Sequence, residues 1–192
     1  MNAAQPLIEP SAVKPRDAGR TRAAILDAAQ EAFSSRGYLA TGVREVTAAA
    51  GVNPALVSRY FGSKEKLYEA ALGDLLDARL VTGAGRARFG KAMLRLLASG
   101  TPTRRNPLPM MVLASADPGA RAITARLLHD LFLVPMVAWL GGEEAASRAA
   151  RFVVLASGLT LYSELYPLEP LTGELDPATR QWIETSFQAL VD

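Results

Sequence analysis

The segment from Thr21 to Leu72 reads TRAAILDAAQEAFSSRGYLATGVREVTAAAGVNPALVSRYFGSKEKLYEAAL. Within it, two short helical patterns meet across residues 51–53, Gly-Val-Asn, which is the spacing of a helix-turn-helix. A longer amphipathic helix precedes this turn and another follows it. The second helix of such a motif has the width to enter the DNA major groove, where base edges can be distinguished. The segment therefore predicts a DNA-reading module.

The first helix of this module is expected from about Thr21 to Arg36. Arg36 then lies in the last turn and Gly37 just beyond it, as a helix C-terminus favours. Apolar residues recur through the helix at the spacing of one buried face. They are Ile25, Ala28, Ala29, Ala32 and Phe33.

The turn itself carries the signals that end one helix and begin the next. A second helix is expected over about Val43 to Ala50, with Val46 as its main core residue. Gly51 ends that helix, Asn53 can cap the third, and Pro54 suits a first helical position because it needs no backbone N–H. The third helix then runs from Pro54 to about Tyr60, with Val57 pointing inward to meet Val46.

A fourth helix is expected after Gly62, with Ser63 as its cap. Lys64 lies near its start, where a positive side chain and free backbone N–H groups both suit a phosphate oxygen. Its apolar residues follow the period of a helix with one buried face. They are Leu67, Ala70, Ala71, Leu75 and Ala78.

These residues together resemble the DNA-binding domain of the TetR family of transcriptional repressors. The resemblance covers roughly 50 residues, about a quarter of the chain, and many residue types agree at fixed spacing. The matching positions are Ile25-Leu26 through Phe33, Gly37-Tyr38, Thr41, Val46, Ala50-Gly51-Val52, Tyr60-Phe61 and Ser63-Lys64-Glu65-Lys66-Leu67. Gly42, Thr47 and Ser58 depart from the family pattern, and the change at Ser58 is expected to alter the preferred DNA sequence without threatening the fold.

The expected DNA contacts lie on the second and third helices and at the start of the fourth. Arg44 and Arg59 can contact phosphate or a guanine edge, or can remain solvated or pair with Glu45 or Glu65. Tyr60 can donate to phosphate, which the resemblance favours, or bury its ring. The predicted DNA-binding residues are Thr41, Arg44, Asn53, Pro54, Ala55, Leu56, Ser58, Arg59, Tyr60 and Lys64.

Composition excludes several classes of protein. The chain has no Cys and a single His129, so disulfides, thiolate metal sites and multi-histidine sites are impossible. No apolar run approaches the roughly 20 residues of a membrane span, and the N-terminus does not resemble a signal peptide. The whole net charge of +2 lies in residues 1–72, which agrees with a DNA partner. We expect a cytoplasmic protein without metal or cofactor.

The C-terminal part is predicted to be helical throughout. Lys91–Ser99 resumes a helical pattern after a loop or weak helix start at residues 83–90. Residues 99–109, with three prolines, read as a loop before a short helix at Met110–Ala116. Three longer helices follow. They are expected at Pro118–Leu140, with a kink at Pro135, at Glu143–Tyr166, and from a cap at Asp176 to the end of the chain.

In the arrangement implied by the resemblance, the last two long helices of each subunit form a four-helix bundle with those of a partner. A dimer also explains DNA reading, because one short helix contacts only a few base pairs. The alternative is that the same apolar residues bury inside one subunit. The predicted dimer-interface residues are Phe152, Ala156, Leu159, Trp182, Ile183 and Phe187.

A small-molecule pocket is expected among the apolar residues of the C-terminal part, since such sites are mostly apolar with a few polar groups. Each candidate can equally fill an ordinary core, and His129 can be a structural residue. The effector is expected to be neutral or lipophilic. The predicted ligand-binding residues are Met93, Met110, Met111, His129, Phe132, Met136 and Tyr162.

The sequence thus predicts an all-α protein with about nine helices. The expected division is an N-terminal flexible arm (1–17), a helix-turn-helix domain (18–66), and a helical effector-binding and dimerisation domain (67–192). The predicted function is a homodimeric transcriptional repressor, released from an inverted-repeat DNA operator by a small molecule of unknown identity. An interaction protein that has lost specific DNA binding is the alternative. No nucleophile–base set, metal cluster or phosphate loop suggests an enzyme.

Overall fold

Helices make up the regular secondary structure of residues 15–98 and 106–192, which the computed structural model describes, and no strand occurs among them. The chain runs through α1 (Pro15–Ala40), α2 (Val43–Ala49), α3 (Ala55–Tyr60), α4 (Lys64–Leu75), α5 (Arg79–Thr82), α6 (Phe89–Ala98) and α7 (Pro107–Ala114). It continues through α8 (Pro118–Leu128), η1 (His129–Leu133), α9 (Val134–Leu140), α10 (Ala145–Thr160), η2 (Leu161–Leu165), η3 (Glu169–Leu171) and α11 (Pro177–Gln188). The all-α expectation is confirmed.

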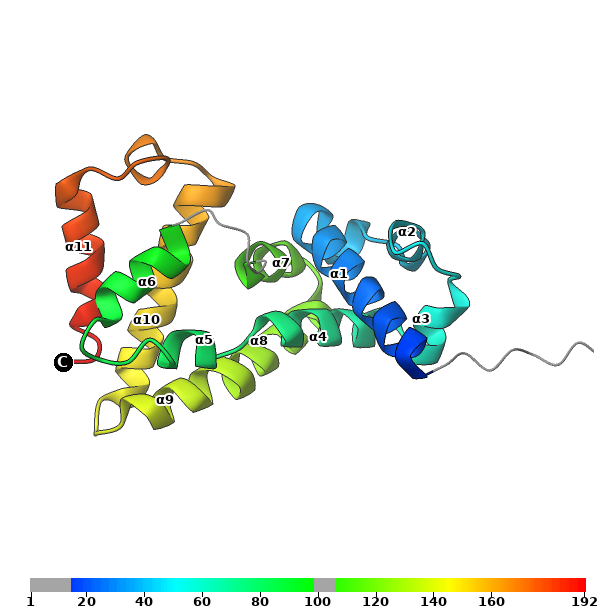
Figure 1. The fold of residues 1–192 in the computed structure, drawn as a ribbon, viewed down its shortest axis with the longest axis horizontal. Helices are drawn as coiled ribbons and strands as arrows, with labels where there is room; N and C mark the ends of the chain where they lie inside the picture. The colour runs from blue at the N-terminus through cyan, green and yellow to red at the C-terminus, as the bar shows by residue number, and fades with distance from the viewer. Residues whose placement is uncertain (1–14, 99–105) are drawn as a thin grey trace, which may run out of the picture.

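The molecule is elongated, with α2 and α3 at one end and α6, α10 and α11 at the other (Figure 1). Helices α4, α7 and α8 lie between these ends. Two separate clusters of buried apolar residues match this layout. One joins α1–α4 to α7 and α8, and the other holds α6, α9, α10 and α11 together. The expected domain boundary after residue 66 falls inside α4, whose buried residues all belong to the first cluster.

Short polar side chains cap the helices where the sequence predicted them. Asn53 Oδ1 accepts a hydrogen bond from the Ala55 N–H at 2.9 Å, and Ser63 Oγ accepts one from Lys66 at 3.2 Å. Asp117 and Asp176 cap α8 and α11 in the same way. These caps satisfy backbone N–H groups that a helix start leaves without partners.

The first helix begins earlier than predicted. Pro15–Asp17 already belong to α1, so the prediction of a flexible arm over residues 1–17 is wrong at these three positions. Residues 1–14 lie outside the described part of the chain. Gly37 has φ of 79° and interrupts the helix, which supports the expected break after Arg36. A methyl group at Gly37 would lie 3.1 Å from the Leu113 backbone oxygen, so α7 packs closely against this point.

The expected loop at residues 99–109 is wrong at its end, because Pro107–Pro109 form the first turn of α7. Asn106 caps that turn, its Oδ1 accepting from the Leu108 N–H at 2.9 Å. Proline is tolerated in a first helical turn, where its missing N–H has no intrahelical partner. Residues 99–105 lie outside the described part of the chain.

Two long helices contain π-helical turns. In the first, His129–Leu133 form a π turn that ends two residues before Pro135, and the Val134 N–H donates to the His129 carbonyl. The sequence predicted a kink at Pro135, and the structure has a local widening of the helix beside it, as proline disturbs the usual hydrogen bonding nearby. In the second, Leu161–Leu165 form a π turn at the end of the run that begins at Ala145, two residues later than predicted.

The run from Pro118 to Leu140 is the described helix that satisfies, by length and mean hydropathy, the requirement for a membrane span. Helices of water-soluble proteins meet the same requirement, so one such helix is weak evidence for a membrane. It also carries Arg126, whose guanidinium forms an ion pair with Glu69 on α4 at 2.6 Å.

Candidate functional site

Helix α3 presents a polar face to solvent. Ala55, Ser58 and Arg59 are exposed, while Leu56 and Tyr60 are partly buried. Val57 is buried in the same cluster as Val46, as predicted for the two helices of the turn. Because the buried side of α3 is held by this packing, the exposed residues of α3 share the opposite side. Asn53 and Pro54 are exposed at its start.

Thr41 does not belong to this surface. Its side chain is only 1% exposed, and its hydroxyl donates toward the carbonyl oxygens of Gly37 at 2.8 Å and Ala32 at 3.1 Å. The prediction of a DNA contact by this side chain is therefore wrong. Thr41 instead ties the end of α1 to the start of α2.

Arg44 on α2 and Arg59 on α3 are exposed, and no described residue forms an ion pair with either. The acidic residues that were the alternative partners are engaged elsewhere. Glu45 pairs with Arg36 at 3.3 Å and accepts from the Gly42 N–H at 2.8 Å, while Glu65 accepts from Tyr38. Both guanidinium groups thus remain available for an external anion.

Lys64 has a partner within the chain. Its ammonium nitrogen lies 4.4 Å from the centre of the Tyr38 ring, a cation–π distance. The Tyr38 hydroxyl donates to Glu65 Oε1 at 3.1 Å. Burial, and then the hydrogen bond to Glu65, raise the pKa of Tyr38 to about 12. The first turn of α4 is thereby attached to the end of α1.

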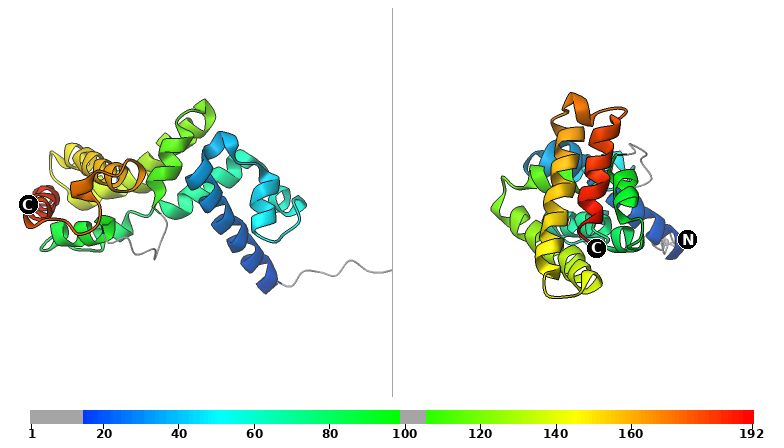
Figure 2. Two further views of the ribbon diagram at one scale, coloured as in Figure 1. Left: turned by 90° about the horizontal axis from the view of Figure 1, so that it is seen from above. Right: turned by 90° about the vertical axis from the view of Figure 1, so that its left-hand side faces the viewer.

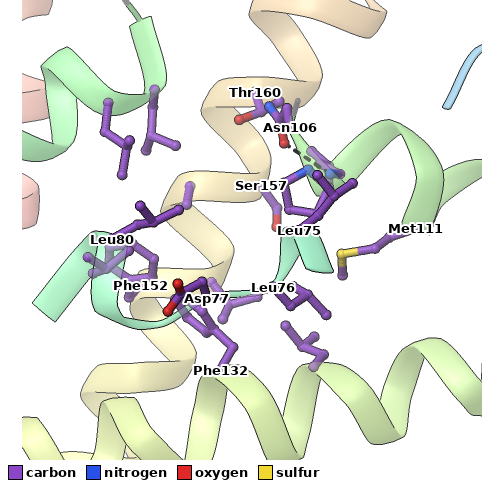
Figure 3. Close-up of a pocket in the computed structure, with 18 of the residues that line it drawn as sticks. Leu75, Leu76, Asp77, Leu80, Asn106, Met111, Phe132, Phe152, Ser157 and Thr160 are labelled. Carbon is purple, nitrogen blue, oxygen red and sulfur yellow. Dashed lines mark hydrogen bonds between the residues drawn. The ribbon is translucent and has the colours of Figure 1, made fainter. Parts of the chain in front are cut away.

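A second feature, away from α3, is a cavity of about 380 Å³ between α4, α7 and α10 (Figure 3). The end of α4 and the start of α5 form one wall, and α7 and the end of α6 form another. Residues of α8, η1, α10 and η2 complete the lining. Most of the lining is apolar. It consists of Leu75, Leu76, Asp77, Leu80, Val81, Leu96, Leu97, Asn106, Pro107, Leu108, Met111, Leu128, Phe132, Phe152, Val153, Ala156, Ser157, Thr160 and Glu164.

The structure brings only two of the predicted ligand-binding residues, Met111 and Phe132, to this cavity. Met93, Met110 and Met136 are at most 1% exposed and fill the two cores instead. His129 and Tyr162 are exposed on the surface, and the His129 Nδ1 atom lies 2.8 Å from a carboxylate oxygen of its neighbour Asp130. These five residues are not part of the lining.

The predicted dimer residues also separate into groups. Phe152, Leu159, Ile183 and Phe187 are buried within the chain itself, in the cluster that holds α10 and α11 together. The assignment of these four side chains to an intersubunit surface is therefore wrong, and Ala156 lines the cavity. Trp182 alone is strongly exposed, at 61%.

Sequence reasoning missed most of the cavity. Its polar residues include Asn106, Ser157 and Thr160, and the last two interrupt the most apolar stretch of the C-terminal part. The hydroxyl groups within this otherwise apolar helix were the sequence signal for a cavity. Leu75 and its neighbours at the end of α4 carry no such signal, because their apolar spacing is the same as that of any helix packed in a core.

Specific contacts join the α3 end of the molecule to the cavity. The buried hydroxyls of Tyr68 on α4 and Thr124 on α8 lie 2.7 Å apart. Lys66 and Arg126 donate hydrogen bonds to Glu69, which lower the pKa of its carboxyl group. Helix α7 lines the cavity and packs extensively against α1. Helices α4 and α7 therefore both contribute to the cavity wall and pack against α1.

Known proteins resemble this chain in sequence and in fold. An HTH-type transcriptional repressor of Mycobacterium tuberculosis is 38% identical over 90 residues, 42% of this chain and 48% of that protein. The HTH-type transcriptional regulator BetI of Rhizobium meliloti is 36% identical over 96 residues, 50% of this chain and 43% of that protein. The chain thus spans about half the length of the curated relatives it matches.

Among solved structures, a TetR-family regulator from Streptomyces coelicolor A3 superposes with a TM-score of 0.57 at 26% identity, over 94% of this chain and 99% of that one. The family model described as bacterial regulatory proteins, tetR family, matches residues 25–71. A second, described as tetracyclin repressor-like C-terminal domain, matches residues 87–191, more than half of the chain. The chain therefore belongs to the TetR family, a family of DNA-binding transcriptional regulators and not of enzymes.

Proposed function

We propose that this protein is a homodimeric repressor that binds an inverted-repeat DNA operator and leaves it when a small molecule enters the cavity. The observation that carries the proposal is the exposed face of α3, with Arg59 unpaired by any described residue. A helix held from behind by Val57 and projecting polar side chains outward has the form that major-groove reading requires.

The DNA contacts that we propose divide by chemistry. Ala55, Ser58 and Arg59 face outward on α3 and can reach base edges, where a guanidinium can bond both acceptors of guanine. Arg44, Tyr60 and Lys64 suit phosphate oxygens. Lys64 lies at the start of α4 over the Tyr38 ring, where the positive end of the helix dipole also favours an anion. Thr41 is not included.

A dimer formed by α10 and α11 would supply the second reading helix. These two helices run side by side along the end of the molecule that is farthest from α3, as the right-hand view of Figure 2 shows. Val154 on α10 is 72% exposed and Trp182 on α11 is 61% exposed. Large exposed apolar side chains on neighbouring helices are typical of a surface that is covered by a partner. A two-fold axis through this surface would relate two subunits, so the dimer would present two α3 helices to DNA.

Release would follow from the position of the cavity. Leu75 and Leu76 at the end of α4 and Met111 on α7 form part of its wall, while the other end of α4 adjoins α3. A ligand shifts the protein toward whichever arrangement of α4 and α7 binds it more tightly. If that arrangement misplaces the two α3 helices, operator affinity falls by the same coupling free energy. We place this action in the cytoplasm.

The experiment begins with selection of a binding sequence from random duplex DNA by the purified protein, followed by anisotropy titration of the selected site. Arg59→Ala is expected to weaken binding by roughly 5- to 150-fold, as loss of a base contact does. Lys64→Gln should weaken binding to all sequences and reduce the slope of affinity against salt by about one charge. Arg88→Ala, an exposed arginine near α6, is the control.

Failure to select any sequence would support an interaction protein without specific DNA binding. Unchanged affinity of Arg59→Ala would show that α3 is not the reading helix. Expression of a reporter gene under the selected site, with and without the protein, tests repression against activation.

A further inference from the structure

The cavity has a definite electrostatic character. The charged residues among its lining are Asp77 and Glu164, and both are carboxylates, with no Lys, Arg or His in the described lining. Asp77 is half-buried and Glu164 is exposed to solvent at this lining. A carboxylate beside a mostly apolar cavity disfavours an anionic ligand, and a carboxylate without a cationic partner attracts a positive charge on the ligand.

The two carboxylates differ in their surroundings. Asp77 receives two hydrogen bonds from the Arg79 guanidinium, at 2.9 and 3.0 Å, so its charge is already compensated. Glu164 accepts from the amide of Asn106, at 3.3 and 3.4 Å to its two oxygens, and no described cation forms an ion pair with it. An amide is neutral, so this bond orients the carboxylate without cancelling its charge. Glu164 is therefore the group with charge available to a ligand.

The rest of the cavity suits an apolar body. Figure 3 shows Asn106, Ser157 and Thr160 gathered at one end, and Phe132 and Phe152 at the other. The two phenylalanine rings have centroids 5.5 Å apart. Aromatic rings can pack against a flat apolar group and also favour a nearby positive charge.

We infer that the ligand of this cavity is an amphiphilic cation, with an apolar or aromatic body between Phe132, Phe152 and Met111 and an ammonium group near Glu164. This inference rests on the proposed function only in calling the cavity the effector site. It keeps the expected lipophilic body and replaces the expected neutral charge with a positive one, because Glu164 lies in the cavity lining.

The test uses three probes that share a biphenyl body on a short alkyl arm and end in trimethylammonium, hydroxyl or carboxylate. Binding to the full chain, without DNA, is measured by isothermal titration calorimetry. The ammonium probe is expected to bind about tenfold more tightly than the alcohol, and the carboxylate most weakly. Added salt should weaken binding of the ammonium probe but not of the alcohol.

The variant Glu164→Gln keeps the shape and the contact to Asn106 while removing the charge. It should reduce the preference for ammonium over alcohol to about twofold or less, with the affinity for the alcohol unchanged. Glu169→Gln, an exposed carboxylate outside the lining, is the matched control and should behave as the wild type. Circular dichroism of both variants establishes that they fold.

An alcohol or carboxylate that binds as tightly as the ammonium probe, absence of binding by all three probes, or a preference that survives in Glu164→Gln would overturn the inference. The proposed function is tested separately by adding the ammonium probe to the protein–DNA complex. Selective binding with no release of DNA would leave the charge preference standing and contradict the proposed mechanism of release.

Discussion

Tyr38, at the end of α1, donates a hydrogen bond of 3.1 Å to the Oε1 atom of Glu65 in the first turn of α4. The ring of Tyr38 is buried against Phe33 and Tyr68, with centroids 6.0 and 5.3 Å away. A phenol in this setting resists ionisation, first because burial disfavours the phenolate and then because the hydrogen bond to Glu65 requires the protonated hydroxyl. The pKa of Tyr38 accordingly rises to about 12.

This shift predicts how stability changes at alkaline pH. A pKa that is higher in the folded than in the unfolded chain contributes stability fully below about pH 10, and the contribution is lost as pH rises toward 12. The loss is on the order of 2 kcal/mol. Tyr38→Phe should be less stable than the wild type at neutral pH, by about 1 kcal/mol for the missing hydrogen bond, and should lose less on going to alkaline pH. Urea unfolding at several pH values measures the stability difference at neutral pH and the loss of stability at alkaline pH. The variant Tyr162→Phe, at an exposed tyrosine, is the control.

Gly90 allows α6 and α11 to approach closely. A methyl group placed on it would lie 2.0 Å from the backbone oxygen of Glu184, which no rotation of a side chain can relieve. Gly90→Ala should therefore destabilise the protein by about 1–3 kcal/mol and lower the midpoint of thermal unfolding by several degrees. Gly19→Ala, on an open face of α1, should instead be neutral or stabilising. Equal midpoints for the two variants would contradict the close approach.

The proposed dimer surface predicts the effect of a charge placed on it. Val154→Lys should produce a monomer, because a buried ammonium without a partner is costly at an interface. Leu131→Lys changes another exposed apolar residue, on η1, and should leave the dimer intact. Analytical ultracentrifugation gives the mass of each variant, and circular dichroism shows that both are folded. A dimeric Val154→Lys protein would place the interface elsewhere.

The helix starts were predictable because their causes are local. Asn53, Ser63, Asp117 and Asp176 each bond an N–H two or three residues ahead, so the signal and its effect lie within one turn. The same signal is present at Asn106, before Pro107, but the prolines that follow it also favour a loop, so the start of α7 is predicted too late. The π turn at His129–Leu133 has Pro135 as a local signal, whereas the one at Leu161–Leu165 has no comparable signal.

The cavity was predicted poorly because it is space that side chains from segments distant in the sequence leave unfilled. Helical periodicity indicates that Met93, Met110 and Met136 face inward, yet it does not indicate whether a neighbour fills the space beside them. At these positions the neighbours do so completely. Beside Met111 the walls come from α4, α7 and α10, whose meeting depends on the whole arrangement of the chain. Phe152, Leu159, Ile183 and Phe187 were misassigned for the same reason.

Helix α7 touches the cavity through Met111 and meets Gly37 of α1 through Leu113, where an added methyl group would lie only 3.1 Å from the Leu113 backbone oxygen. The side chains that would choose a ligand and those that would choose a DNA sequence share no member. A biosensor built on this scaffold can thus be retuned for a new inducer and a new promoter in independent libraries. Both libraries should keep residues 37 and 113 constant, because the helix that lines the cavity packs there against the DNA-binding region.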